Sequence, residues 1–200
     1  MTVSGILDAL EAKGELDNTY IVFTSDNGAE QVAVRQGRLP NGYFRGAKNT
    51  LYEGGIRVPC IFSWKGQLPA GKTEESTIMS MDLFPTFLNL GGGDFYPEQV
   101  DGTDLWPLFS NGEPLAERKL YWSNTGKSAT RQGDWKLVRL KDKVELFNLA
   151  EDPDEMNDLS GNPEYRDRLN TMFSDIDQWW LEVTMDTPLE GKDIENKNLR

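Results

Sequence analysis

The chain has 200 residues and a net charge of −12, from 21 Lys and Arg against 33 Asp and Glu. Its hydrophobic content of 38% is too high for a disordered acidic tail, and its apolar runs are far shorter than the ~20 residues of a membrane helix. We therefore expect a folded chain with no membrane span, no signal peptide and, given its acidity, no nucleic acid partner. Histidine is absent and Cys60 is the one cysteine, which excludes a histidine base, an intrachain disulfide and a cysteine-rich zinc site.

The first half of the chain alternates helix and strand patterns, which is typical of an α/β fold. Apolar residues at helical spacing predict the helices, and runs of β-branched and aromatic residues predict the strands. The first such run predicts a strand buried on both faces, as in a parallel sheet. The expected elements are a helix over 3–13, a strand over 19–24, a long surface loop over 31–43, a strand over 56–63 and a helix over 80–90 that Ser80 or Asp82 caps.

The second half predicts a small antiparallel meander followed by a helix. Pro163 sits where a first helical turn tolerates proline, and apolar residues continue at helical spacing to Val183. The polar segment 187–200 is expected to be frayed. The strands are expected at 120–123, 129–131, 135–140 and 144–149. We predict an α/β domain over 1–112 and a small antiparallel subdomain with a terminal helix over 113–200.

The first candidate site is the pair Asp26-Asn27, directly after the first predicted strand. Ligands of parallel α/β sheets bind beyond the carboxyl ends of strands. A carboxylate beside an amide oxygen suits Ca²⁺ or Mg²⁺, although such cations need six or more oxygens. The alternative is a simple Asp-Asn-Gly turn.

The second candidate is the basic pair Arg45 and Lys48, which could converge on an anion. Gly46, Gly54 and Gly55 would permit close backbone approach or positive φ. The alternative is a solvated basic loop. Cys60 lies in an apolar strand pattern, so we expect a buried filler and not a nucleophile.

These motifs together resemble the C-terminal half of the sulfatase family, in the alkaline phosphatase superfamily. The resemblance extends to about residue 183. It rests on the following segments, in this order: Thr24-Ser-Asp-Asn-Gly28, Arg45-Gly-Ala-Lys48, Glu53-Gly-Gly-Ile-Arg-Val-Pro59, Met81-Asp-Leu-Phe-Pro-Thr-Phe-Leu88, Arg131-Gln-Gly-Asp-Trp-Lys-Leu-Val138 and Glu145-Leu-Phe-Asn-Leu-Ala-Glu-Asp-Pro-Asp-Glu-Met-Asn-Asp-Leu159.

The resemblance implies a function in sulfate ester hydrolysis. Asp26 and Asn27 would ligate Ca²⁺, with Mg²⁺ as the less favoured ion. Lys48 would hold the sulfate of the substrate, Arg45 would share its pocket, and the loop 31–43 would form the substrate-facing rim. The substrate would be a sulfated carbohydrate or an aryl sulfate.

The chain departs from the family pattern in its nucleophile. The family makes formylglycine from a Cys/Ser-x-Pro-x-Arg motif, but Cys60 is followed by Ile-Phe-Ser-Trp and no serine opens that motif. The catalytic histidines and the paired N-terminal aspartates also lack counterparts. We therefore expect a portion that needs the N-terminal half of the fold and is inactive alone.

Two alternatives to the sulfatase interpretation stay open at this point. One is a related phosphohydrolase of the same superfamily with a Ser or Thr nucleophile, and the other is a non-catalytic binding or assembly module. Full-length relatives are often exported to the periplasm or outside the cell. A core without the first strands of its parallel sheet would expose an unpaired edge.

Overall fold

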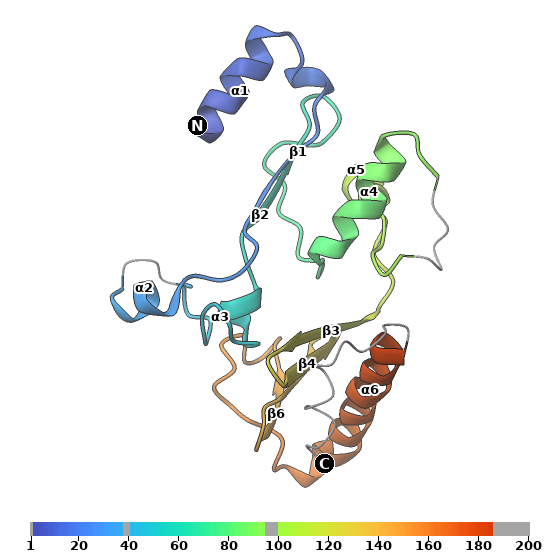
Figure 1. The fold of residues 1–200 in the computed structure, drawn as a ribbon. Helices are drawn as coiled ribbons and strands as arrows, with labels where there is room; N and C mark the ends of the chain where they lie inside the picture. The colour runs from blue at the N-terminus through green and yellow to red at the C-terminus, as the bar shows by residue number, and fades with distance from the viewer. Residues whose placement is uncertain (1, 38–40, 95–99, 186–200) are drawn as a thin grey trace. The chain divides into compact units, whose positions relative to one another are not determined.

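The computed structural model describes residues 2–37, 41–94 and 100–185 (Figure 1). They fall into two compact units, one formed from Met1–Phe23 and Cys60–Ala116 and the other from Thr24–Pro59 and Glu117–Arg200. The grouping of Thr24–Pro59 with the C-terminal sheet matters for the site, because both candidate motifs lie in that segment. The predicted boundary between an α/β domain over 1–112 and a small subdomain over 113–200 stays a prediction.

The first unit contains the predicted N-terminal helix and the first two strands. Helix α1 (Val3–Ala12) begins after Thr2, whose Oγ1 accepts a hydrogen bond from the backbone N–H of Gly5. The short helix η1 (Leu16–Asn18) connects α1 to β1 (Ile21–Thr24), which pairs with β2 (Cys60–Ser63). The helix and both strands confirm the predicted order of elements, with shorter strands than predicted.

The predicted helix over 80–90 is observed as η2 (Ser80–Asp82) continuing into α4 (Leu83–Leu90). The buried carboxylate of Asp82 accepts from the backbone N–H of Met79 at 2.7 Å and of Thr103 at 2.9 Å. Thr86 Oγ1 accepts from the backbone N–H of Leu105 at 2.8 Å. The bonds to Thr103 and Leu105 hold the segment before helix α5 (Trp106–Asn111) against α4. Helix α5 was not predicted from the sequence.

The second unit is built on a four-stranded antiparallel meander in sequence order, as predicted. Its strands are β3 (Lys119–Asn124), β4 (Lys127–Gln132), β5 (Trp135–Arg139) and β6 (Val144–Asn148). After the short helix η4 (Pro163–Tyr165), helix α6 (Arg166–Met185) runs along the sheet (Figure 1). Two further short helices, α2 (Gln31–Arg35) and α3 (Glu53–Ile56), complete the unit.

The two faces of this sheet bury different partners, because neighbouring residues of a strand point to opposite faces. Leu137 and Leu146 pack with Met172 and Ile176 of α6. The next residues along the same strands, Val138 and Phe147, form a second cluster that includes Leu51. The segment before α3 is therefore packed on the sheet face opposite to α6.

Three sequence-based predictions were wrong in detail. Strand β1 is half-buried to exposed, with Phe23 49% exposed, because it pairs only with β2 in the described chain and lacks the flanking layers of a buried parallel strand. Cys60 is exposed on β2 for the same reason, and not buried. The strand predicted over 56–63 starts at Cys60, since Ile56 ends α3.

The predicted loop over 31–43 contains the helix α2, although residues 38–40 lie outside the described residues. The prediction of a loop was wrong for Gln31–Arg35, and the described residues 36, 37 and 41–43 are outside helices and strands, as predicted. The predicted fraying over 187–200 also lies outside the described residues. Among the residues that the structure describes, no helix has both the length and the apolar composition needed to cross a membrane.

We expect the packing of α6 on the sheet to be essential to the second unit. Ile176 is fully buried against the sheet. Ile176→Ala should lower the free energy of unfolding by about 2–5 kcal/mol, the usual cost of such a truncation in a core. Urea unfolding followed by circular dichroism measures it. Leu181→Ala is the control, since Leu181 is 58% exposed on the same helix and should change stability by under ~0.5 kcal/mol. Equal losses for the two variants would contradict the packing described.

Candidate functional site

The turn that carries Asp26 and Asn27 is held against α3 by a close backbone approach. The Gly28 N–H donates to the Gly55 carbonyl at 2.9 Å. A Cβ atom at Gly28 would lie 1.9 Å from the Gly54 carbonyl oxygen, so no other residue fits at this position without displacing backbone. Within the turn, Ser25 Oγ donates to the Asn27 carbonyl at 2.8 Å. Gly54 and Gly55, which were predicted to allow close approach of a ligand, are instead closely approached by other parts of the backbone.

Asn41 joins three segments of the site, and sequence analysis did not single it out. Its Oδ1 accepts from the Ala29 N–H at 3.0 Å, and its Nδ2 donates to the carbonyls of Gly46 at 2.9 Å and Gly54 at 2.7 Å. An Asn-Gly pair in a loop ordinarily indicates only a turn, so nothing in the sequence marked this role. Asn41 fixes the Asp26 turn, the basic loop and α3 relative to one another.

Lys48 lies on the loop that precedes α3. Its backbone N–H donates to the Ala29 carbonyl at 2.9 Å, which brings the loop beside the Asp26 turn. Its Nζ donates to Glu30 Oε1 at 2.6 Å. The pKa of the Lys48 ammonium is raised, chiefly by this hydrogen bond and the charge of Glu30 and also by the charge of Asp26. The structure thus brings the two sequence-predicted motifs together and keeps Lys48 positively charged.

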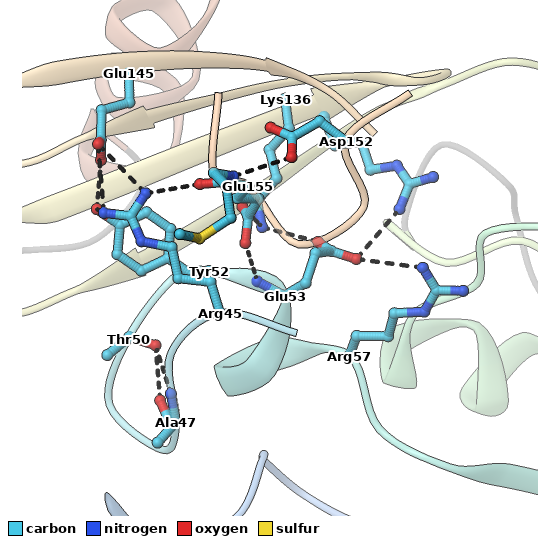
Figure 2. A network of polar contacts seen from close by, with 12 residues as sticks. Arg45, Ala47, Thr50, Tyr52, Glu53, Arg57, Lys136, Glu145, Asp152 and Glu155 are labelled. Carbon is cyan, nitrogen blue, oxygen red and sulfur yellow. Dashed lines mark hydrogen bonds and ion pairs between the residues drawn. The ribbon is translucent and has the colours of Figure 1, made fainter. Parts of the chain in front are cut away.

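Arg45 points to the antiparallel sheet (Figure 2). Its guanidinium donates to the Glu155 carbonyl at 2.9 Å, to the Tyr52 hydroxyl at 3.2 Å and to Glu145 Oε1 at 3.4 Å. It also lies 3.9 Å from the centroid of the Tyr52 ring. These contacts anchor the basic loop on the sheet. The prediction that Arg45 shares a substrate pocket with Lys48 stays a prediction.

A buried cluster of charges links α3 to the sheet, and Figure 2 shows its members converging. Lys136 Nζ lies 2.8 Å from Glu53 Oε1 and 2.8 Å from Glu155 Oε1, and all three side chains are at most 3% exposed. Glu155 Oε2 also accepts from the Glu53 N–H at 2.6 Å. Arg57 and Arg131 approach the second oxygen of Glu53 at 3.7 and 3.8 Å. We call Glu53, Lys136 and Glu155 the buried triad.

Sequence analysis placed Glu53, Lys136 and Glu155 within quoted motifs but assigned them no role. The signal that could have found Lys136 is its position in β5, between Trp135 and Leu137, where it shares a sheet face with Val138. A lysine at a core-facing position of a strand needs a buried acidic partner. Two such partners come from distant segments, so the sequence alone could not identify them.

The charges of this region shift the titration of its carboxyl groups. Burial raises the pKa of Glu155, and the nearby Lys136 opposes that change without cancelling it. Burial would also raise the pKa of Glu145, but hydrogen bonds from Lys143 and Tyr52, with the charge of Arg45, bring it below its ordinary value. Glu145 is therefore stabilised as an anion between Lys143, Tyr52 and Arg45.

The donors of Asp26 and Asn27 fit a hard divalent cation in kind but not in number. They supply one carboxylate and one amide, and the Asp26 side chain is exposed. In the part of the chain that the structure describes, no three His, Cys, Asp or Glu side chains gather where they could hold a metal. A Ca²⁺ site needs six or more oxygens. The described residues thus supply at most part of one.

Comparisons with known proteins agree on one family. Residues 1–93 match the family model described as Sulfatase. The chain is 38% identical over 122 residues to the steryl-sulfatase of Mus musculus, covering 58% of this chain and 20% of that protein. It is 30% identical over 207 residues to the N-acetylglucosamine-6-O-sulfatase of Bacteroides thetaiotaomicron, covering 96% of this chain and 35% of that protein.

A solved structure supports the fold over almost the whole chain. The crystal structure of Ps i-CgsB in complex with k-i-k-neocarrahexaose matches with a TM-score of 0.80 and 30% identity, over 98% of this chain and 44% of that one. This similarity confirms the predicted α/β fold class, that of the alkaline-phosphatase-like sulfatases, with its C-terminal antiparallel sheet and helix. The chain spans less than half the length of the proteins it matches.

We expect the buried triad to contribute strongly to the stability of the second unit. Lys136→Met would leave two buried carboxylates facing each other without their cation, and breaking a buried ion pair in this way typically costs about 3–5 kcal/mol. Urea unfolding measures the loss. Lys119→Met is the control, because Lys119 pairs with Asp175 at 2.7 Å on the same sheet but is 39% exposed, and such pairs contribute at most about 1 kcal/mol. A loss for Lys136→Met no larger than the control's would contradict the role of the triad.

The lowered pKa of Glu145 predicts how its contribution to stability depends on pH. Because the pKa of Glu145 in the folded state is below the ordinary value of 4.5, the ionised side chain stabilises the fold when the pH is above 4.5. This contribution disappears as the pH falls through the folded-state pKa. Glu145→Gln should therefore lower the free energy of unfolding near neutral pH, and its difference from wild type should shrink below about pH 4. Urea unfolding of both proteins across this range tests it. A difference that does not change with pH would exclude the anionic role of Glu145.

Proposed function

Because the chain belongs to the sulfatase family, we propose that it contributes the sulfate-binding lysine and two metal ligands to a sulfuric ester hydrolase. The observation that carries this proposal is the hydrogen bond from the Lys48 N–H to the carbonyl of Ala29 at 2.9 Å. Ala29 is three residues after Asp26 in the sequence. Two motifs that are 22 positions apart (48 − 26) therefore meet in space. Neither motif alone would support an anion site.

Lys48 is the group that we assign to the sulfate of the substrate. Its side chain is 38% exposed, so a solute can reach the ammonium. Lysine presents a compact positive charge with three donors, which suits the oxygens of a sulfuryl group. A cation in this position helps most where negative charge grows in the transition state. Arg45 acts in this proposal as a positioning residue for the loop, given its contacts with Tyr52 and Glu155.

Asp26 and Asn27 are the residues that we assign to a divalent cation, with Ca²⁺ preferred for two hard oxygen donors. When bound, such an ion would polarise sulfuryl oxygens. Asp26 is exposed, and no three His, Cys, Asp or Glu side chains gather among the described residues where they could hold a metal, so this is a partial site. Its remaining ligands would come from other parts of the enzyme.

Sulfated carbohydrates are the substrate class that we favour. One relative is an N-acetylglucosamine-6-O-sulfatase, and a solved neighbour with 30% identity is complexed with neocarrahexaose. The second choice is a sulfate ester of an alcohol that is not a carbohydrate, because another relative is a steryl-sulfatase. The rim of the proposed site includes the exposed Tyr43 in the loop 31–43, where specificity commonly resides.

The 200 residues carry no Cys/Ser-x-Pro-x-Arg motif and no histidine. We therefore assign binding groups to this chain and the nucleophile to another part of the enzyme. By itself the chain should not hydrolyse a chromogenic aryl sulfate above the buffer rate. This property also distinguishes our proposal from an independent phosphohydrolase.

Lys48→Ala tests the proposal in a chimera that joins these residues to the upstream part of a sulfatase relative carrying the nucleophile motif. Losing one preorganised charge-stabilising group typically lowers turnover about 10²–10³-fold, and we expect that loss in kcat/KM for 4-nitrophenyl sulfate. Lys72→Ala is the matched control, because Lys72 is an exposed lysine paired with Glu74 in the other unit. Activity of the Lys48→Ala chimera within about threefold of the parent, well under the 1.36 kcal/mol of a tenfold change, would remove Lys48 from the site.

A further inference from the structure

The ammonium of Lys48 is shared with an acidic side chain at the proposed substrate site. Lys48 Nζ lies 2.6 Å from Glu30 Oε1, and the Glu30 side chain is 63% exposed. The backbone fixes this pair, since the Lys48 N–H is bonded to the carbonyl of Ala29, the residue before Glu30. Gln31 Nε2 also donates to the Lys48 carbonyl at 3.4 Å. Glu30 is therefore held beside the ammonium by its own neighbours in the sequence.

Glu30 changes the charge that an incoming anion meets. The positive charge of Lys48 is balanced by the carboxylate in contact with it, and the charge of Asp26 also acts on the ammonium. Since an ammonium has three donors, one hydrogen bond to Glu30 leaves two for the oxygens of a ligand. Such a site can still donate hydrogen bonds to an anion. Its net positive charge is small, however, so a second negative charge on that anion gains little attraction.

This difference separates two ester classes of the same shape. A sulfate monoester carries a single negative charge, whereas a phosphate monoester carries about −1.5 to −2 at pH 7. Like charges placed together oppose binding and are a common means of rejecting a wrong partner. The second charge of a phosphate ester would have to lie near the Glu30 carboxylate.

We propose that Glu30 is a specificity-determining residue, whose carboxylate offsets the positive charge of the Lys48 ammonium and thereby favours monoanionic sulfate esters over dianionic phosphate esters. The inference rests on the proposed function, in which Lys48 binds the sulfate of the substrate. Glu30 has no part in bond cleavage in this proposal. Its effect is on the relative affinity for two anions.

Binding of methyl sulfate and methyl phosphate to the 200-residue chain tests the inference without needing turnover. Titrations followed by ligand-detected NMR at low salt and near pH 8, where methyl phosphate is a dianion, give both dissociation constants. Glu30→Gln keeps the size and an acceptor oxygen but removes the charge. It should increase the affinity for methyl phosphate about threefold to fivefold more than that for methyl sulfate, the range typical of one solvent-exposed charge interaction.

Two control variants isolate the effect of the charge. Glu30→Asp keeps the carboxylate and should keep the preference for methyl sulfate. Glu164→Gln makes the same change in net charge at an exposed position in η4 and should leave the ratio of the two affinities unchanged. A change of that ratio by Glu164→Gln equal to the change by Glu30→Gln would overturn the inference, because net charge alone would then explain it.

The outcomes also separate this inference from the proposed function. Lys48→Ala should abolish binding of both anions. If it does so but Glu30→Gln leaves the ratio of affinities unchanged, Glu30 is not a specificity residue, and the assignment of Lys48 stands. If both anions still bind to Lys48→Ala, or if neither binds to the wild-type chain, the anion site itself is refuted and the role of Glu30 with it.

Discussion

The buried lysine between two buried carboxylates is the interaction on which the second unit depends. Lys136 comes from β5, Glu53 from the start of α3 and Glu155 from the loop after β6, so three segments must meet for any one of these charges to be buried. An unpaired buried charge is strongly unfavourable, whereas a paired and hydrogen-bonded one is tolerated. The triad therefore stabilises one arrangement of these segments and excludes others, and the beginning of α3 is fixed by it.

The position of the proposed site follows from that arrangement. Gly54 and Gly55 come directly after Glu53, and the Asp26 turn can approach them because Gly28 has no side chain. Side chains at Gly54 and Gly55 would instead clash with backbone of the basic loop. Asn41 then ties the same turn to the basic loop. Asp26 is exposed and Asn27 and Lys48 are half-buried, yet the backbone beneath them is held by contacts that lead back to the buried triad. A rigid base under exposed binding groups keeps their geometry while leaving them accessible to substrate.

Arg45 and Lys48 illustrate how one short motif can serve two purposes. They are three residues apart, but Arg45 joins Tyr52, Glu145 and a backbone carbonyl at the sheet, whereas Lys48 meets Glu30 at the surface. The planar guanidinium suits several simultaneous hydrogen bonds and stacking on a ring. The compact ammonium suits a single anion. The two basic residues of the motif are therefore not interchangeable.

The sequence by itself determined the order of the elements, the antiparallel meander, the terminal helix and the family, because hydrophobic periodicity, turn residues and linked motifs are local signals. It also marked Asp26, Asn27 and Lys48 as candidates. Only the tertiary structure decided what those residues meet: the role of Asn41, the partners of Lys136, the inward orientation of Arg45 and the pairing of Lys48 with Glu30. The pairing of Arg45 with Glu145, for example, spans 100 positions, and it depends on the way the chain folds back on itself, which no local pattern of residues records.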